Sequence, residues 1–251
     1  QNVMSNVSIR EGVMISHFTM LSDWNWYRRR GGNNYQTALQ FLEGWLPMLA
    51  PITPHLAEEF WHRMGHKELL AEFQLPDNII QINKDMVLEY ENYLHKVIDS
   101  SRNVKGLAKR HTDTKITTMV IQTAPKWMYD LSREAIVLQS KYFDFNSKGI
   151  DYLKSLPIFK NEQIRGEIFK IWTNLTVGSK KKRGKIFTWS EDDKKLILNM
   201  FDESEFLSSN NSFIANELEL DLVRVYSVGE GPDVAGKAKV AFPLEPAITF
   251  S

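Results

Sequence analysis

A proline-stiffened corner joins two predicted helices at Trp45-Leu46-Pro47-Met48-Leu49-Ala50-Pro51-Ile52-Thr53-Pro54-His55-Leu56-Ala57-Glu58-Glu59-Phe60-Trp61. Upstream leucines at three- and four-residue spacing predict one apolar helical stripe, formed by Leu39, Leu42, Leu46 and Leu49. Pro51 ends that helix, because proline lacks an amide donor and disfavours helical geometry in the residue before it. Thr53 is the expected N-cap of the next helix, with Pro54 in its first turn. The bulky buried face of this second helix is predicted to consist of Leu56, Phe60 and Trp61.

Helical spacing continues on both sides of the corner. Apolar residues recurring every three or four positions predict four helices, over residues 7–30, 35–50, 54–65 and 85–110. The longest of them carries a seam of apolar and small residues that suits packing into a bundle. We therefore expect a helical bundle over residues 1–112.

The periodicity changes near residue 114, where short β-branched and alternating segments begin. Strands are predicted over residues 115–122, 217–226 and 246–250, the last as an edge strand. Further helices are predicted over residues 125–143, 151–156, 161–175 and 190–206. Ser190, followed three residues later by Asp193, is the pattern of a helix N-terminus. The expected fold is therefore mixed: a helical bundle followed by a smaller α/β domain over residues 113–251.

The amino-acid composition limits the classes of protein to which the chain can belong. Of the 251 residues, 43% are hydrophobic, so a sizeable core can be buried. The chain has no cysteine, which excludes disulfides and thiolate metal sites and fits the cytoplasm. No apolar run approaches the roughly 20 residues that span a bilayer, so no membrane partner is expected. The chain starts at Gln1 rather than an initiator methionine, so we expect a piece of a longer protein.

The 31 basic and 31 acidic residues cancel, so any contact with RNA must come from local clusters of charge. Three such clusters stand out, and each has a simpler alternative as a solvated or helix-terminal charge run. The first, Arg28-Arg29-Arg30, also suits a helix C-terminus. The second shares one face of the long predicted helix. The third combines cations, glycine and aromatic rings, which suits phosphate contact and base stacking. The candidate RNA-binding residues are Arg28, Arg29, Arg30, Arg102, Lys105, Lys109, Arg110, Lys180, Lys181, Lys182, Arg183, Lys185 and Trp189.

Metal and catalytic sites are not predicted. His62 and His66 lie one helical turn apart, but no glutamate follows His62 in the order that a zinc protease needs. A surface or packing role is therefore favoured for both histidines. The glycine pairs Gly31-Gly32 and Gly229-Glu230-Gly231 are too short for phosphate-binding loops.

Several segments resemble one enzyme family. Met48 to Trp61 is similar to a segment of the anticodon-binding helical domain of class I aminoacyl-tRNA synthetases. Leucyl-tRNA synthetases of the archaeal and eukaryotic cytosolic type carry segments that resemble Ser22-Asp23-Trp24-Asn25-Trp26-Tyr27-Arg28-Arg29-Arg30-Gly31-Gly32, Thr123-Ala124-Pro125-Lys126-Trp127-Met128-Tyr129 and Gly236-Lys237-Ala238-Lys239-Val240-Ala241-Phe242-Pro243-Leu244-Glu245-Pro246-Ala247-Ile248. An isoleucine enzyme would be expected to bring cysteine zinc ligands, and a valine enzyme a charged coiled-coil tail; both are absent.

The resemblance implies the C-terminal, tRNA-binding part of a leucine–tRNA ligase. The class I signatures His-Ile-Gly-His and Lys-Met-Ser-Lys-Ser are absent from the 251 residues, so ATP and Mg²⁺ would belong to a catalytic core elsewhere. This part alone is then expected to be inactive and without a cofactor. Its implied partners are leucine tRNA, at the elbow and variable arm, and the rest of the synthetase, within a monomer. The alternatives are the tRNA-binding region of an isoleucyl, valyl or methionyl enzyme, or a protein-interaction module that binds no RNA.

Overall fold

The computed structural model describes residues 9–73, 86–110, 115–141, 145–179 and 182–251. The chain forms two compact units, Gln1–Asn83 and Lys84–Ser251, and each is described by itself. The described helices include none with the length and apolar composition that crossing a membrane requires.

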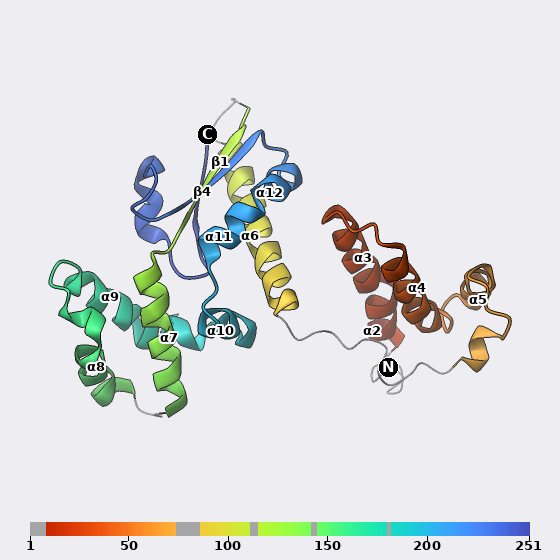
Figure 1. Ribbon diagram of the computed structural model, residues 1–251, viewed down its shortest axis with the longest axis horizontal. Helices are drawn as coiled ribbons and strands as arrows, with labels where there is room; N and C mark the ends of the chain where they lie inside the picture. The colour runs from red at the N-terminus through yellow and green to blue at the C-terminus, as the bar shows by residue number, and fades with distance from the viewer. Residues whose placement is uncertain (1–8, 74–85, 111–114, 142–144, 180–181) are drawn as a thin grey trace. The chain divides into compact units, whose positions relative to one another are not determined.

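The first unit contains the predicted helices around the corner (Figure 1). Its elements are α2 (Ile9–Val13), η1 (Met14–Thr19), α3 (Met20–Arg29), α4 (Tyr35–Leu49), α5 (Pro54–Arg63) and η2 (Leu70–Glu72). The first three form one continuous helical run, in which η1 is a π-helical stretch. The Trp45 indole of α4 donates a hydrogen bond to the Ser16 carbonyl inside η1. A π-helical stretch of this kind fits a side chain that competes for a helical carbonyl.

The corner itself has the predicted geometry. Thr53 is the N-cap residue of α5 and Pro54 follows at its start. Thr53 caps through its position and not its side chain, because its hydroxyl turns back toward the Leu49 carbonyl, 3.4 Å away. Trp61 is completely buried, as predicted, in a small core with Leu46, Ala57 and Leu70.

The predicted buried face of α5 is partly wrong. Leu56 and Phe60 are 55% and 44% exposed. Ala57 and Trp61, which lie one turn apart, face the core instead. Leu56 and Phe60 precede these two residues by one position each, which turns them away by roughly 100° around the helix axis.

The second unit combines helices with small sheets. Its helices are α6 (Val87–Ala108), α7 (Lys126–Lys141), α8 (Phe145–Ser155), η3 (Pro157–Lys160), α9 (Arg165–Thr176), η4 (Lys185–Phe187), α10 (Glu191–Leu198), α11 (Glu203–Ser209), α12 (Asn211–Glu217) and η5 (Val234–Val240). Its strands are β1 (Thr118–Thr123), β2 (Gly178–Ser179), β3 (Lys182–Arg183), β4 (Leu222–Ser227) and β5 (Ala247–Phe250).

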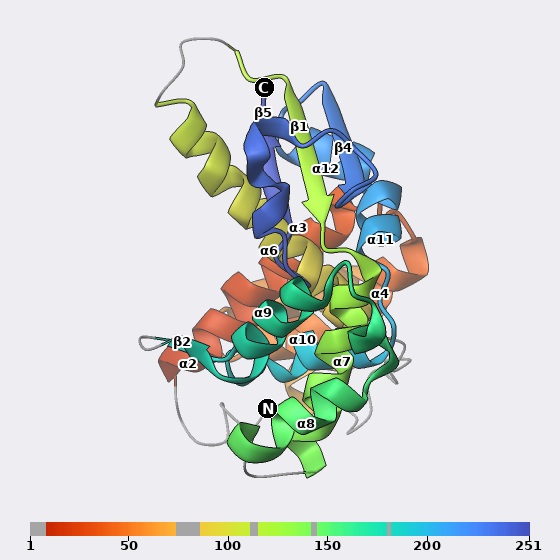
Figure 2. The ribbon, with the colours of Figure 1, turned by 90° about the vertical axis from the view of Figure 1, so that its left-hand side faces the viewer.

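The main sheet has the strand order β4-β1-β5 (Figure 2). Central β1 runs parallel to β4, with Ile121 beside Val225, and antiparallel to β5, with Ile121 beside Ile248. The parallel pair requires a long crossover connection, which here contains α7 to α12. This mixed sheet after a helical region confirms the predicted fold class, and it places β5 at an edge as predicted.

A large buried cluster lies among the helices of the crossover. Leu131 and Leu138 of α7 pack with Trp172 and Leu175 of α9, and Ile186 of η4 joins them. Burying such side chains contributes roughly 1.5–3 kcal/mol each. This cluster holds α9 and η4 in place, and these two elements flank the short β2–β3 pair.

Three predicted boundaries are wrong. The helix predicted over residues 151–156 begins six residues earlier, at Phe145. The helix predicted over residues 190–206 ends at Leu198, and α11 starts after the N-cap Asp202. The strand predicted over residues 217–226 begins only at Leu222, because Glu217 completes α12. At the last two boundaries a non-glycine residue adopts a left-handed conformation: Met200 (φ 57°) and Glu219 (φ 52°). Glycine usually supplies this conformation, so the sequence gives no visible stop signal.

The two compact units divide at a different residue from the predicted domain boundary. The units divide after Asn83, whereas the periodicity suggests a boundary between residues 112 and 113. The reason lies in α6, which packs against α10 and β5. Lys96 and Glu89 of α6 pair with Asp193 and Lys195 of α10, at 2.7 and 3.0 Å. The domain boundary between residues 112 and 113 stays a prediction.

Candidate nucleic-acid interface

The first basic cluster ends α3. Arg28 and Arg29 are exposed and Arg30 is half-buried at the C-cap position. The Arg29 guanidinium lies over the Trp26 ring, 5.4 Å from its centroid. Cations at a helix C-terminus are favoured by the helix dipole, so the cluster has a structural role as well as a capacity to bind phosphate.

The second cluster, on α6, divides into two pairs. Arg102 makes ion pairs with Asp99 (3.0 Å) and with Glu217 at the end of α12 (2.8 Å). The Lys105 ammonium donates to the Leu218 carbonyl and, at 3.4 Å, to the Glu219 carbonyl. Burial and the nearby Lys109 charge lower the pKa of Lys105. Arg102 and Lys105 therefore attach α6 to α12, while Lys109 and Arg110 are exposed.

The third cluster lies after α9. Lys180 and Lys181 fall outside the described residues, and Lys182 and Arg183 supply the backbone of β3. Gly184 lies so close to the Leu175 carbonyl and the Thr176 backbone that a Cβ atom would clash. Lys185 pairs with Glu245, with Nζ–Oε distances of 2.5 and 2.6 Å. The base of this cluster is therefore held in place by packing and by an ion pair.

Trp189 has a packing role in the structure. Its side chain is 8% exposed and belongs to the large core cluster, 6.2 Å from the Phe242 ring. An indole buried to this extent offers no ring face to a nucleotide base. The part of our prediction that gave Trp189 a base-stacking role is therefore not supported by its position.

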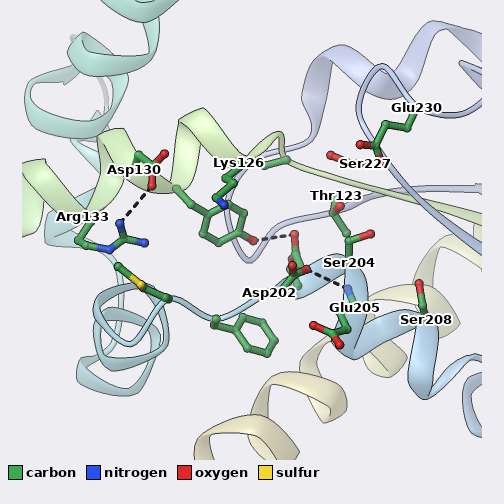
Figure 3. Close-up of a pocket in the computed structure, with 15 residues that line it drawn as sticks. Thr123, Lys126, Asp130, Arg133, Asp202, Ser204, Glu205, Ser208, Ser227 and Glu230 are labelled. Carbon is green, nitrogen blue, oxygen red and sulfur yellow. Dashed lines mark hydrogen bonds and ion pairs between the residues drawn. The ribbon is translucent and has the colours of Figure 1, made fainter. Parts of the chain in front are cut away.

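A cavity of about 660 Å³ lies at the end of β1 and β4 (Figure 3). It is lined by Thr123, Ala124, Lys126, Tyr129, Asp130, Arg133, Met200, Phe201, Asp202, Glu203, Ser204, Glu205, Ser208, Ser227 and Glu230. Arg133 is paired with Asp130 at 3.1 Å, which leaves Lys126 as the other cation of the lining, among several carboxylates. Such a lining repels phosphate, so the cavity does not extend the basic clusters.

The wall of this cavity contains a buried carboxyl group. Glu203 is 2% exposed and accepts hydrogen bonds from the Tyr93 hydroxyl of α6 and, at 2.7 Å, from the Tyr129 hydroxyl of α7. Burial raises the pKa of Glu203 to about 7, although both tyrosines lower it in part. Burial and the Glu203 charge raise the pKa of both tyrosines well above their usual value. The arrangement links three helices and has no exposed nucleophile.

Sequence reasoning missed this cluster, because Glu203 fell inside the helix predicted over residues 190–206. A signal was present. Asp202 and Glu205 have the spacing of an N-cap pair, and the Asp202 side chain indeed accepts from the Glu205 amide at 2.9 Å. That signal marks the start of a helix and places Glu203 in its first turn.

The histidines of the first unit pack and pair locally. The His66 ring stacks on Trp61 with 3.7 Å between centroids, and His62 lies 3.3 Å from Glu58. Among the residues that the structure describes, no three histidine, aspartate or glutamate side chains gather as a metal site.

Comparison with known proteins finds a family model that matches the N-terminal part of the chain. Residues 2–120 match the family model described as the anticodon-binding domain of tRNA ligase. Similar proteins include the leucine–tRNA ligase of Methanococcus maripaludis, 28% identical over 94% of this chain and 22% of that protein. The resemblance inferred from the sequence is confirmed, because the chain is similar to part of a leucine–tRNA ligase.

Two further relatives extend the match. The leucine–tRNA ligase of Methanocaldococcus jannaschii is 27% identical over 98% of this chain and 23% of its own length. Leucine–tRNA ligase 1 of Sulfolobus acidocaldarius is 26% identical over 100% of this chain and 24% of its own length. The chain thus spans less than a quarter of the length of these relatives. The family model includes α6, although α6 packs with the second compact unit.

Proposed function

We propose that this chain is the C-terminal, tRNA-binding part of an ATP-dependent leucine–tRNA ligase. The observation that carries the proposal is the match of residues 2–120 to an anticodon-binding family, within relatives named leucine–tRNA ligase that cover 94–100% of the chain. The chain holds leucine tRNA at its elbow and variable arm. A catalytic core elsewhere in a monomeric cytoplasmic enzyme binds ATP and Mg²⁺ and performs the leucylation.

The contacts in this proposal come from the local basic clusters. Arg28, Arg29 and Arg30 contact phosphate from the end of α3, and Lys109 and Arg110 from the end of α6. Arg102 and Lys105 hold α6 against α12, which positions the second pair of cations. Lys180, Lys181, Lys182 and Arg183, which precede Gly184 and Lys185 in the sequence, contact phosphate as well. Phosphate contacts of this kind give affinity and register, and they carry no base sequence.

The proposal is tested by comparing tRNA ligands on the intact synthetase. We expect leucine tRNA to bind more tightly than the same tRNA with a shortened variable arm and more tightly than a tRNA for another amino acid. Equal affinity for all three would contradict the leucine assignment and favour another class I synthetase. Absence of tRNA binding would favour the alternative, a protein-interaction module, which the net charge of zero suits better.

A further inference from the structure

The connection between α3 and α4 lies in an unusually basic stretch of a neutral chain. Residues 24–42 contain three arginines, Arg28, Arg29 and Arg30, and no aspartate or glutamate. Across the whole chain, by contrast, basic and acidic residues are equal in number. The three arginines outnumber the two flanking carboxylates, Asp23 and Glu43, so this connection carries a net positive charge.

Backbone hydrogen bonds fix the shape of this connection. The Gly31 and Gly32 amides donate to the Arg28 and Tyr27 carbonyls at 3.1 and 2.9 Å. Gly31 adopts a left-handed conformation with φ 89°, which glycine accepts without strain. At the far end, the Asn34 side chain accepts from the Thr37 amide at 3.0 Å and caps α4.

An aromatic column supports the same connection from beneath. The Tyr27 ring lies directly against Gly32, and the Tyr27 hydroxyl accepts from the Asn34 amide at 3.3 Å. Tyr27 packs on Trp24 with 5.2 Å between centroids, and Trp24 stacks on Phe41 of α4 at 4.6 Å. The connection is therefore ordered by folding, and a ligand that binds there does not have to order it.

An exposed aromatic ring also lies at this connection. Tyr35, the first residue of α4, is 71% exposed. Arg28 and Arg29 are exposed in the last turn of α3, and residues 30–34 separate that turn from Tyr35 along the chain. An exposed aromatic ring beside cations is the arrangement that proteins use to bind single-stranded nucleic acid.

We propose that the connection between α3 and α4 binds an unpaired nucleotide of tRNA, with its base stacked on Tyr35 and the flanking phosphates on Arg28 and Arg29. The nucleotide must be unpaired, because only an unstacked base offers its face to a side chain. This inference rests on the proposed function and names one contact of the same tRNA. It gives Tyr35 a role in holding the tRNA that the arginines alone do not provide.

The test is tRNA binding by the intact synthetase carrying Tyr35→Ala or Tyr35→Phe, measured across a range of salt concentrations. Tyr35→Ala should weaken leucine tRNA binding by about 5- to 150-fold at every salt concentration and leave the salt slope unchanged. Tyr35→Phe keeps the ring and should bind within about twofold of wild type. Arg28→Gln with Arg29→Gln should instead flatten the slope, by up to about 0.7 for each single-strand phosphate that is no longer neutralised.

The matched control is Phe18→Ala, which removes a ring that is 56% exposed on η1, ten residues before Arg28 along the same helical run. This variant should bind like wild type. If wild type binds leucine tRNA and Tyr35→Ala binds equally well, the stacking inference is overturned and the proposed function stands. If wild type binds no tRNA, both are overturned.

A cross-linking experiment decides the class of partner without relying on affinity. A photoreactive p-benzoylphenylalanine placed at position 35 of the intact synthetase should cross-link to leucine tRNA. A cross-link that forms only to protein would overturn the inference, whatever the affinities show.

Discussion

At the scale of single residues, Glu203 gives the structure a dependence on pH. Its pKa of about 7 lies above the ordinary carboxyl value, because burial disfavours the charged form. The folded state therefore binds more protons than the unfolded state between pH 4.5 and 7, and the free energy of unfolding falls as pH rises through this range. Above pH 7 the fold must keep a buried carboxylate, whose partners are the Tyr93 and Tyr129 hydroxyls.

The first prediction concerns Glu203→Gln. The substitution removes the titrating group, so the pH dependence of the unfolding free energy between about pH 4.5 and 7 should become flatter, by on the order of 3 kcal/mol across the range. Urea unfolding at several pH values measures this. The control is Glu205→Gln, an exposed neighbour that should keep the wild-type slope. A Glu203→Gln profile parallel to wild type would show that Glu203 does not titrate in this range.

Trp61 offers a second prediction at the same scale. It is fully buried and contacts the rings of His66 and, at 4.8 Å, Phe73. Trp61→Ala should lower the free energy of unfolding of the first unit by about 3–5 kcal/mol, because it leaves a large cavity. Phe60→Ala, its exposed neighbour, should cost less than about 1 kcal/mol. Similar losses for the two variants would mean that α5 is rotated from its position in the structure.

The residue scale also shows where sequence reasoning reached its limit. Burial of Trp61 was predictable from the helical spacing around the proline corner. The burial of Trp189 was not, because its neighbours in sequence are polar and it packs against Phe242, which lies 53 positions later. Likewise, Lys185 reads as one cation in a basic run, and only the fold brings Glu245 to it. Long-range pairs of this kind leave no local pattern.

At the scale of elements, patterns of spacing and capping predicted most helices and the sheet. The capping box at Ser190 and Asp193 is present as predicted. Two of the errors fall where a helix ends without glycine or proline. After Leu198 the chain turns through Met200, and the Phe201 amide donates to the Leu196 carbonyl at 3.2 Å. Such an ending depends on tertiary packing of Phe201, which the local sequence does not reveal.

The third prediction concerns the element that supports the basic loop. Gly184→Ala should lower the free energy of unfolding by about 1–3 kcal/mol, because a Cβ atom would clash with the backbone of α9. The matched control is Gly166→Ala in the first turn of α9, where the added Cβ meets no atom. That substitution should be neutral or stabilising by up to about 1 kcal/mol. If Gly184→Ala proved as stable as wild type, the close approach of η4 to α9 would be contradicted.

At the scale of the whole molecule, the chain joins a helical part to a small mixed sheet, and its formal charge is zero. Net charge therefore does not attract tRNA. The proposed tRNA binding depends instead on local clusters at the end of α3, on α6 and after α9. We propose that these clusters contact tRNA phosphates. The cluster after α9 is the one to test, because four of its cations, Lys180 to Arg183, can be replaced without removing the Lys185–Glu245 ion pair.

The decisive measurement is a salt titration of leucine tRNA affinity for the intact synthetase and for a loop variant with Lys180, Lys181, Lys182 and Arg183 changed to glutamine. Lys185 is kept because it pairs with Glu245. A charge-matched control changes four exposed lysines elsewhere, Lys115, Lys154, Lys237 and Lys239. We predict that the loop variant binds more weakly and has a flatter salt slope, by up to about 0.9 for each phosphate that is no longer neutralised, while the control parallels wild type. A loop variant with wild-type affinity and slope would contradict the proposed contact between this cluster and tRNA phosphates.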